Sequence, residues 1–205
     1  MKKTLFLTLL LYGNLMVAQN DFQVNYGVAF VDFAIDTSNI ENSDVKKHIL
    51  KSEREAQRAL KPDLNLVTLN YDSKKNLVQV SLIEIMDADE QSSISRALPG
   101  ISNFKHNLNE GMMYYKDGST EKQFDLSDVD WKIIDDYKSI LGYECQKATT
   151  IFTAPNGKTL EIVAWFTTEI PISSGPNRYA GLPGLILEIT NYGRKMYARE
   201  VKFEK

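Results

Sequence analysis

The sequence predicts a mainly β protein: one curled antiparallel sheet, or an open β-barrel, with a single covering helix. Three observations favour this class. Runs of alternating apolar and polar residues recur along the chain, turn-forming residues separate most of them, and only residues 43–61 have a helical period. Consecutive hairpins make neighbouring strands antiparallel, and a broad sheet with an exposed apolar face would aggregate. We therefore expect the sheet to curl over the helix.

The first elements are a strand and a helix. Residues 22–32 alternate with period two, which is typical of a half-buried strand. Ser43 is a suitable N-cap for the helix, and Pro62 ends it. Its apolar stripe consists of Val45, Ile49, Ala56 and Leu60. The rest of its surface carries charges of both signs, which indicates a solvated face, with a membrane or partner surface as the alternative.

Hairpins account for most of the remaining chain. The turn pairs Asp117-Gly118 and Asn156-Gly157 favour tight connections, and the last hairpin turns at residues 191–193. Residues 86–110 are polar and mixed, with Pro99-Gly100 inside them, and predict a long loop or a broken helix. The pattern predicts about nine strands. The sequence contains no internal repeat.

Residues 1–18 have the features of a secretory signal peptide. Lys2 and Lys3 precede a short apolar segment, and the small residue Ala18 offers a cleavage site before Gln19. The apolar run is too short to span about 30 Å of hydrocarbon comfortably. A buried N-terminal helix is the alternative. We assign residues 19–205 to a single domain and expect it to be periplasmic or secreted.

Charge and cysteine usage exclude several classes of protein. The chain has 24 basic and 27 acidic residues, so removing two signal-peptide lysines leaves 22 against 27, or a net charge of -5. This acidic balance argues against nucleic-acid binding, which requires many phosphates to be neutralised. No cysteine stands at the cleavage point to accept a lipid, and no later segment is apolar enough to cross a membrane.

The segment from residue 171 to 184 departs from the strand pattern. It contains three of the six prolines and three of the eleven glycines, so it is rigid and unsuited to a sheet. Pro183-Gly184 suits the centre of a type II turn. The segment is interpreted first as a corner between two strands. The alternative is the rim of a binding site, because loops on rigid scaffolds often carry recognition.

The hexapeptide at residues 181–186, Gly-Leu-Pro-Gly-Leu-Ile, is the hallmark of a known family. The runs at residues 140–148 and 164–167 are similar to other motifs of that family, although Leu141 is an extra residue between Ile and Gly. The chain therefore resembles the GLPGLI family, also called Porph_ging, of exported Gram-negative bacterial proteins. The resemblance implies export and a biochemical role that is not established, and it supplies no catalytic residues. In strand order and helix placement the expected fold is also similar to the periplasmic lipoprotein carriers.

Catalytic and metal-binding patterns are weak. A hydrolytic triad usually needs a histidine, and only His48 and His106 are present. No nucleophile elbow, zinc-protease, P-loop or dinucleotide motif occurs. Cys145 with Met112, Met113 or a histidine would suit a soft metal, but the spacing gives no ligand cluster. We expect no catalytic site, metal or cofactor, and the sole cysteine cannot form a disulfide within the chain.

The leading functional hypothesis is a non-enzymatic exported binding or accessory protein of the envelope. Its partner would be an apolar ligand, a peptide or an envelope protein. The predicted ligand-binding residues are Trp131, Tyr143, Trp165, Pro176, Tyr179, Leu182 and Pro183. Together with Phe166, the aromatic members would line a concave face of the sheet, although ordinary core packing is the simpler explanation. The alternative function is a metal-handling or thiol-active envelope protein that uses Cys145.

Overall fold

The computed structural model describes seven parts of the chain: residues 20–31, 41–60, 64–97, 102–153, 157, 159–191 and 193–204. The predicted signal peptide, the predicted helix end at Pro62 and the Pro99-Gly100 pair lie outside these residues. Among the described residues, no helix is both long and apolar enough to cross a membrane.

The described residues form one antiparallel sheet of eleven strands. The strands are β1 (Phe22–Phe30), β2 (Val67–Asp72), β3 (Leu77–Leu82), β4 (Phe104–Asn107), β5 (Met112–Asp117), β6 (Thr120–Asp125), β7 (Lys132–Ile140), β8 (Tyr143–Thr153), β9 (Thr159–Thr167), β10 (Leu185–Asn191) and β11 (Arg194–Phe203). The mainly β class predicted from the sequence is confirmed, as is an open sheet rather than a closed barrel.

Two meanders meet at the centre of this sheet. The strand order is β6-β5-β4-β3-β2-β1-β11-β10-β9-β8-β7, so the first and last strands of the chain pair with each other. In their register Phe22 lies opposite Phe203 and Phe30 opposite Arg194, with a bulge after Asn25. Every other neighbouring pair is consecutive in sequence. Pairing of β1 with β11 therefore joins two sets of local hairpins into one sheet.

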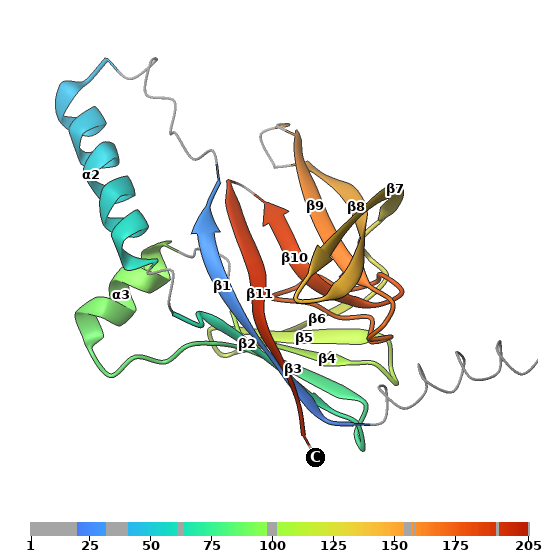
Figure 1. Cartoon of the computed structure of the whole chain (residues 1–205). Helices are drawn as coiled ribbons and strands as arrows, with labels where there is room; N and C mark the ends of the chain where they lie inside the picture. Colours follow the sequence, from blue (N-terminus) through green and yellow to red (C-terminus); the bar gives the residue numbers. More distant parts are fainter. Residues whose placement is uncertain are drawn as a thin grey trace, which may run out of the picture.

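The sheet must curl because β6 and β7 form its opposite edges. At about 4.8 Å between neighbouring strands, a flat sheet of this size would hold its edges roughly 48 Å apart. The linker between these edge strands, residues 126–131, spans at most about 25 Å even when extended. The two halves accordingly turn toward each other, and Figure 1 shows the resulting half-barrel, open between β6 and β7.

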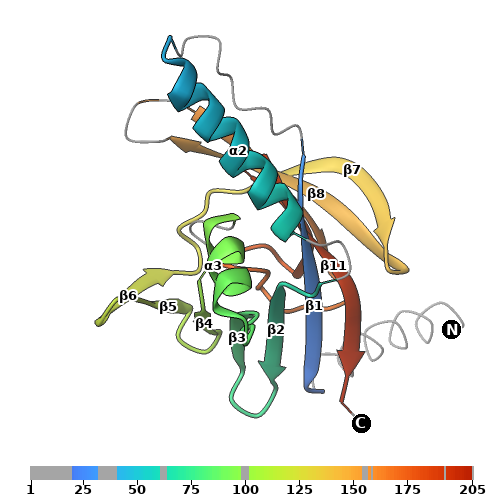
Figure 2. The same ribbon diagram turned by 90° about the vertical axis from the view of Figure 1, so that its left-hand side faces the viewer.

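Two helices lie on the convex side of the sheet (Figures 1 and 2). The longer helix α2 (Ser43–Ala59) begins after Asn42, whose Oδ1 accepts the backbone N–H groups of Asp44 and Val45. The N-cap is therefore Asn42, one residue before the predicted Ser43. The helix contacts α3 (Ala88–Ala97), which lies in the segment where the sequence predicted a loop or broken helix.

The core lies mainly on the concave face of the sheet. Even-numbered residues of β1 point into it, and Tyr26 is fully buried with its hydroxyl donating to the carbonyl oxygen of Ile186 at 2.8 Å. Burial raises the pKa of Tyr26, so the phenol remains protonated. This bond joins the central strand to β10 across the interior and leaves the buried hydroxyl satisfied.

The sequence located most strands but not all of them. The predicted turn at Asp117-Gly118 joins β5 to β6, and the last predicted hairpin is formed by β10 and β11. Two predictions were incomplete: β4 lies within the segment 86–110, and the sheet has eleven strands instead of about nine. The short strand β4 (Phe104–Asn107) is too brief for its alternation to be distinguished from a loop.

The turn between β7 and β8 places a leucine in a backbone conformation that leucine rarely adopts. Leu141 and Gly142 both have positive φ, of 55° and 87°, which is the requirement of a type I′ hairpin turn. Leucine is poorly suited to this region and is 48% exposed here. We expect Leu141→Asn to raise the free energy of unfolding by about 0.5 to 1 kcal/mol.

Urea unfolding would measure this change. Ile151→Asn is the matched control, because Ile151 is also exposed but lies inside β8, where asparagine is disfavoured. If Leu141→Asn were no more stable than the natural chain, the turn would not be strained as described.

Candidate functional site

The interior of the half-barrel is filled by residues 170–184, here called the inner loop. It connects β9 to β10 on the concave side of the sheet (Figure 1). Most of its residues are buried, and the exposed ones are Pro171, Arg178, Gly181 and Pro183. Its backbone is bonded to its own base, since Leu185 N donates to Ile170 O and Ile186 N donates to Ser174 O. The loop therefore forms part of the core, as an internal plug.

Three glycines allow the inner loop to pack so closely. A Cβ at Gly184 would overlap the carbonyl oxygen of Thr167, and one at Gly175 would lie 2.6 Å from the Cβ of Ile186. Gly181 has a φ of +91°, and a Cβ there would lie 2.7 Å from the carbonyl oxygen of Leu126. Two of these glycines belong to the hexapeptide at residues 181–186. That motif is thus explained by backbone approach, which only glycine permits.

The inner loop is also held by the linker that joins the sheet edges. Trp131 Nε1 donates to the carbonyl oxygen of Ala180 at 2.8 Å, and its ring centroid lies 6.5 Å from that of Tyr179. The Tyr179 hydroxyl accepts a hydrogen bond from Asn191 Nδ2 at the end of β10. These contacts connect the loop to both β10 and the linker, so they stabilise the curl of the sheet.

The opposite side of the inner loop meets β4 through a buried histidine. His106 Nδ1 lies 2.7 Å from Ser174 Oγ, and His106 Nε2 lies 3.1 Å from the carbonyl oxygen of Asn177. His106 and Ser174 are both fully buried. Burial lowers the pKa of His106 to about 4, while the bond to Asn177 opposes this shift. The imidazole is neutral at pH 7, and here it serves as a structural bridge.

A groove lies on the convex side of the sheet, beside α3. Its volume is about 670 Å³, which lies within the range of small-ligand sites. Because neighbouring strand residues point to opposite faces, Gln79, Lys105 and Tyr114 are on the face opposite His106. The lining also includes two glutamates, further amide and hydroxyl groups, and apolar residues: Glu84, Glu121, Ser81, Ser102, Asn103, Gln91, Leu82 and Ile83.

Several groove side chains are held in place by hydrogen bonds. Asn103 Oδ1 accepts from the backbone N–H of Leu82 at 2.9 Å, and Gln91 Oε1 accepts from that of Ile85 at 2.7 Å. The Tyr114 hydroxyl donates to Glu110 at 2.6 Å, and Lys105 Nζ lies 5.9 Å from the centroid of the Tyr114 ring. Fixed polar groups around an aromatic ring can select the orientation of a ligand without large rearrangement.

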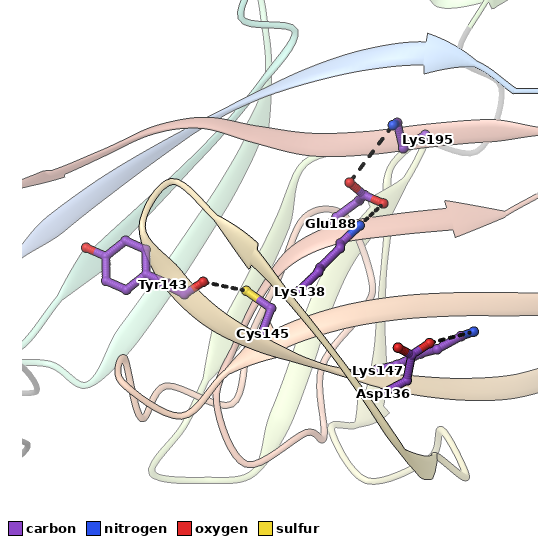
Figure 3. Close-up of polar contacts among 7 residues, drawn as sticks. All are labelled: Asp136, Lys138, Tyr143, Cys145, Lys147, Glu188 and Lys195. Atoms are coloured by element: carbon purple, nitrogen blue, oxygen red, sulfur yellow. Dashed lines mark hydrogen bonds and ion pairs between the residues drawn. The ribbon is translucent and has the colours of Figure 1, made fainter.

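Cys145 lies at the other end of the sheet, among charged residues of β7, β10 and β11 (Figure 3). Its thiol is fully buried and contacts the carbonyl oxygen of Tyr143 at 3.7 Å. Lys138, its cross-strand neighbour, forms a 2.8 Å ion pair with Glu188, which lies 3.9 Å from Lys195. The ammonium of Lys138 also lies 4.3 Å from the centroid of the Trp165 ring.

This environment disfavours the thiolate form of Cys145. Burial raises the pKa of its thiol to about 11, and the smaller opposing effects of the Ile140 backbone and Lys138 do not offset it. A thiol that stays protonated at pH 7 is a poor nucleophile and a poor metal ligand. Within the described part of the chain, no three histidine, cysteine or carboxylate side chains are grouped to hold a metal ion.

The residues predicted to bind a ligand are not gathered in one place. Trp131, Tyr179 and Leu182 pack on the concave side, and Pro176 is buried in the inner loop. Pro183 is exposed, and Tyr143 is half-buried at the start of β8. Trp165 points to the opposite face of β9 from Phe166, because the side chains of adjacent strand residues point to alternate faces. The expected single aromatic surface is therefore divided between two faces.

Sequence reasoning missed both the groove and the histidine bridge. The groove combines residues of β3 to β6 with α3, and no spacing within one segment brings them together. The sequence around His106 does contain a usable pattern, since His106 and Phe104 alternate with polar residues in a short strand. That signal indicates burial only, and its partner Ser174 is distant in the sequence.

Because the inner loop is closely packed, a single methyl group added at Gly184 should strongly destabilise the folded protein. Gly184→Ala would place a Cβ on the Thr167 carbonyl, so we expect a loss of about 3 kcal/mol or more in the free energy of unfolding. Gly118→Ala is the control, since Gly118 has a φ of +63° but open space around it, and should cost only about 1 kcal/mol. Equal losses in urea unfolding would contradict the packing explanation.

Comparison with solved structures supports the fold. Two crystal forms of PNGF-II, in space groups P21 and C2, align with TM-scores of 0.56 and 0.54 at 15% and 14% sequence identity. Each alignment covers 91% of this chain, but only 29% and 28% of the PNGF-II chain. The likeness is one of fold, and this chain spans less than a third of that larger protein.

Sequence comparison gives a family without a known activity. No curated protein matches the chain. The model of a family described as "Protein of unknown function (Porph_ging)" matches residues 153–188, which include β9, the inner loop and the start of β10. The resemblance predicted from the hexapeptide is therefore confirmed over these residues, which match the Porph_ging family of proteins of unknown function.

Proposed function

We propose that this chain is an exported, non-enzymatic accessory protein of the bacterial envelope that binds an extended polypeptide segment of a partner. The convex groove beside α3 is the proposed binding site. The observation that supports this most directly is its chemistry, because polar and apolar groups line it together over a volume of about 670 Å³.

A peptide suits this lining better than an apolar ligand does. A peptide backbone brings both donors and acceptors, and the groove offers amides, hydroxyls, ammonium groups and carboxylates. Lys105 and Lys116 balance Glu84 and Glu121, so neither charge sign dominates. An apolar ligand would bury these groups without partners, at a cost of about 1 to 3 kcal/mol each.

The concave face is a less suitable place for an apolar ligand. Tyr179, Ala180 and Leu182 of the inner loop are buried there, against the apolar residues of the sheet. A ligand would have to displace the loop and expose that surface again. Binding in the groove requires no such rearrangement.

The alternative function, metal or thiol chemistry at Cys145, has less support. It requires an accessible thiolate, whereas Cys145 is fully buried and its pKa is raised. The nearby charge of Lys138 is already paired with that of Glu188. These contacts are sufficient to explain a buried structural cysteine.

Peptide selection would test the proposed site. Random dodecapeptides displayed on phage would be selected on the mature protein, and the selected peptide would be measured by calorimetry. We expect Tyr114→Ala and Lys105→Glu each to weaken binding at least about tenfold, or ~1.4 kcal/mol, because both side chains line the groove. Melting curves would show that the variants fold.

Two controls make this experiment specific. Lys132→Glu has the same change of charge at the start of β7, the opposite edge of the sheet, and should leave binding unchanged. Cys145→Ser should also bind normally, whereas the alternative function requires a loss. Failure to select any peptide, or binding that the groove variants leave intact, would refute the proposed site.

Export is tested separately from binding. The basic, apolar and small residues of segment 1–18 favour cleavage after Ala18. We expect the protein expressed with its leader in a Gram-negative host to leave the cytoplasm with Gln19 as its first residue. Mass spectrometry of the periplasmic fraction and medium would measure this, and an intact Met1 in cytoplasmic protein would refute it.

A further inference from the structure

His106 is the one histidine that the structure buries. Among the described buried polar side chains, which also include Asn25, Thr167, Ser174 and Asn177, only that of His106 can gain a positive charge near neutral pH. It lies on β4, whereas Ser174 and Asn177, which it contacts, belong to the inner loop. Its ring therefore joins one half of the sheet to the plug that fills the interior.

The hydrogen bonds define the neutral form of this histidine. The carbonyl oxygen of Asn177 can only accept, so Nε2 carries the hydrogen and donates to it. Nδ1 is then the acceptor, and the Ser174 hydroxyl donates to it at 2.7 Å. Protonation of Nδ1 would reverse the second bond and force the Ser174 hydroxyl to find another acceptor.

No compensating charge faces the ring among its described neighbours. Val78 on β3 and Met113 on β5 are its cross-strand partners, and the ring of Phe104 lies 6.4 Å away, centroid to centroid. The inner loop contributes the Ser174 hydroxyl and the Asn177 carbonyl. A buried imidazolium would therefore lack a carboxylate to stabilise it.

We propose that His106 is a pH-sensitive latch, whose protonation releases the inner loop from β4 and opens the concave face of the half-barrel. Release lets water reach the charged ring, which replaces the solvation that burial removes. The inference does not depend on the proposed groove, because the groove side chains Lys105 and Tyr114 point to the other face of the same strands.

Release can be local because the side chain of His106 bonds only to the inner loop, whereas its backbone stays paired with β3 and β5. The base of the loop is closed by the bond from Leu185 N to Ile170 O, and the central pairing of β1 with β11 lies elsewhere in the sheet. The bond from Ile186 N to Ser174 O lies next to the latch and would open with it. Exchange of the Ile186 amide is thus a direct reporter.

The direction of the pH effect follows from the two protonation equilibria. The pKa of His106 is about 4 in the closed state, against 6.5 for an exposed histidine. The released state therefore binds the proton more tightly, and the closed state loses stability as the pH falls below 6.5. These values give a roughly 20-fold rise in the opening equilibrium between pH 7 and pH 5.

Hydrogen–deuterium exchange of the full mature chain at pH 7 and pH 5 would measure this. After correction for the intrinsic pH dependence of exchange, amides of residues 170–186 should open roughly 20-fold more often at pH 5. Amides of β1 to β3 should change much less. The latch is refuted if the loop shows no increase, or if the strands open in step with it, because the latter would be global unfolding.

Two variants assign the effect to one ring. His106→Gln keeps a donor and an acceptor but cannot titrate, so its loop should show no increase between pH 7 and pH 5. His48→Gln changes the other histidine, which is exposed on α2, and should behave like the natural chain. An increase that persists in His106→Gln would refute the latch. The exchange pattern of the natural chain remains decisive if that variant does not fold.

Discussion

The close approach of the inner loop to the sheet is the constraint on which the rest of the structure depends. Gly184 lies against the Thr167 carbonyl where β9 ends, and Gly175 lies against Ile186 where β10 begins. Because neither position has room for a Cβ, the chain can fold back into the half-barrel directly after β9. The loop then supplies the apolar groups that an open sheet of eleven strands would otherwise leave exposed on its concave side.

The filled interior also determines where recognition can occur. Strand alternation gives β4 two buried residues on the concave face, Phe104 and His106, with Lys105 between them on the opposite face. The concave residues are used to hold the inner loop, whereas Lys105 and its neighbours remain on the convex side. Under the proposed function, the structural and binding side chains therefore lie on opposite faces of one strand, so a groove side chain can change without altering the core.

The sequence predicted what depends on local pattern. Alternation and turn residues located the hairpins of β5 with β6 and β10 with β11, and composition marked residues 171–184 as unlike a strand. It could not predict that β1 pairs with β11, because this pairing joins the two ends of the chain. For the same reason the bridge between His106 and Ser174 was missed, and Trp165 was grouped with Phe166 although strand geometry separates them.

The family match bears on structure more than on function. It covers residues 153–188, and the hexapeptide within it owes its glycines to contacts with Thr167 and Leu126. Packing explains the glycines of this segment. The match therefore indicates how the interior of the curled sheet is filled, and it says little about what the sheet binds. The lining of the groove, from Gln79 to Glu121, lies entirely outside the match. The family match therefore does not bear on the groove, and the proposed binding site rests on this chain's own groove residues.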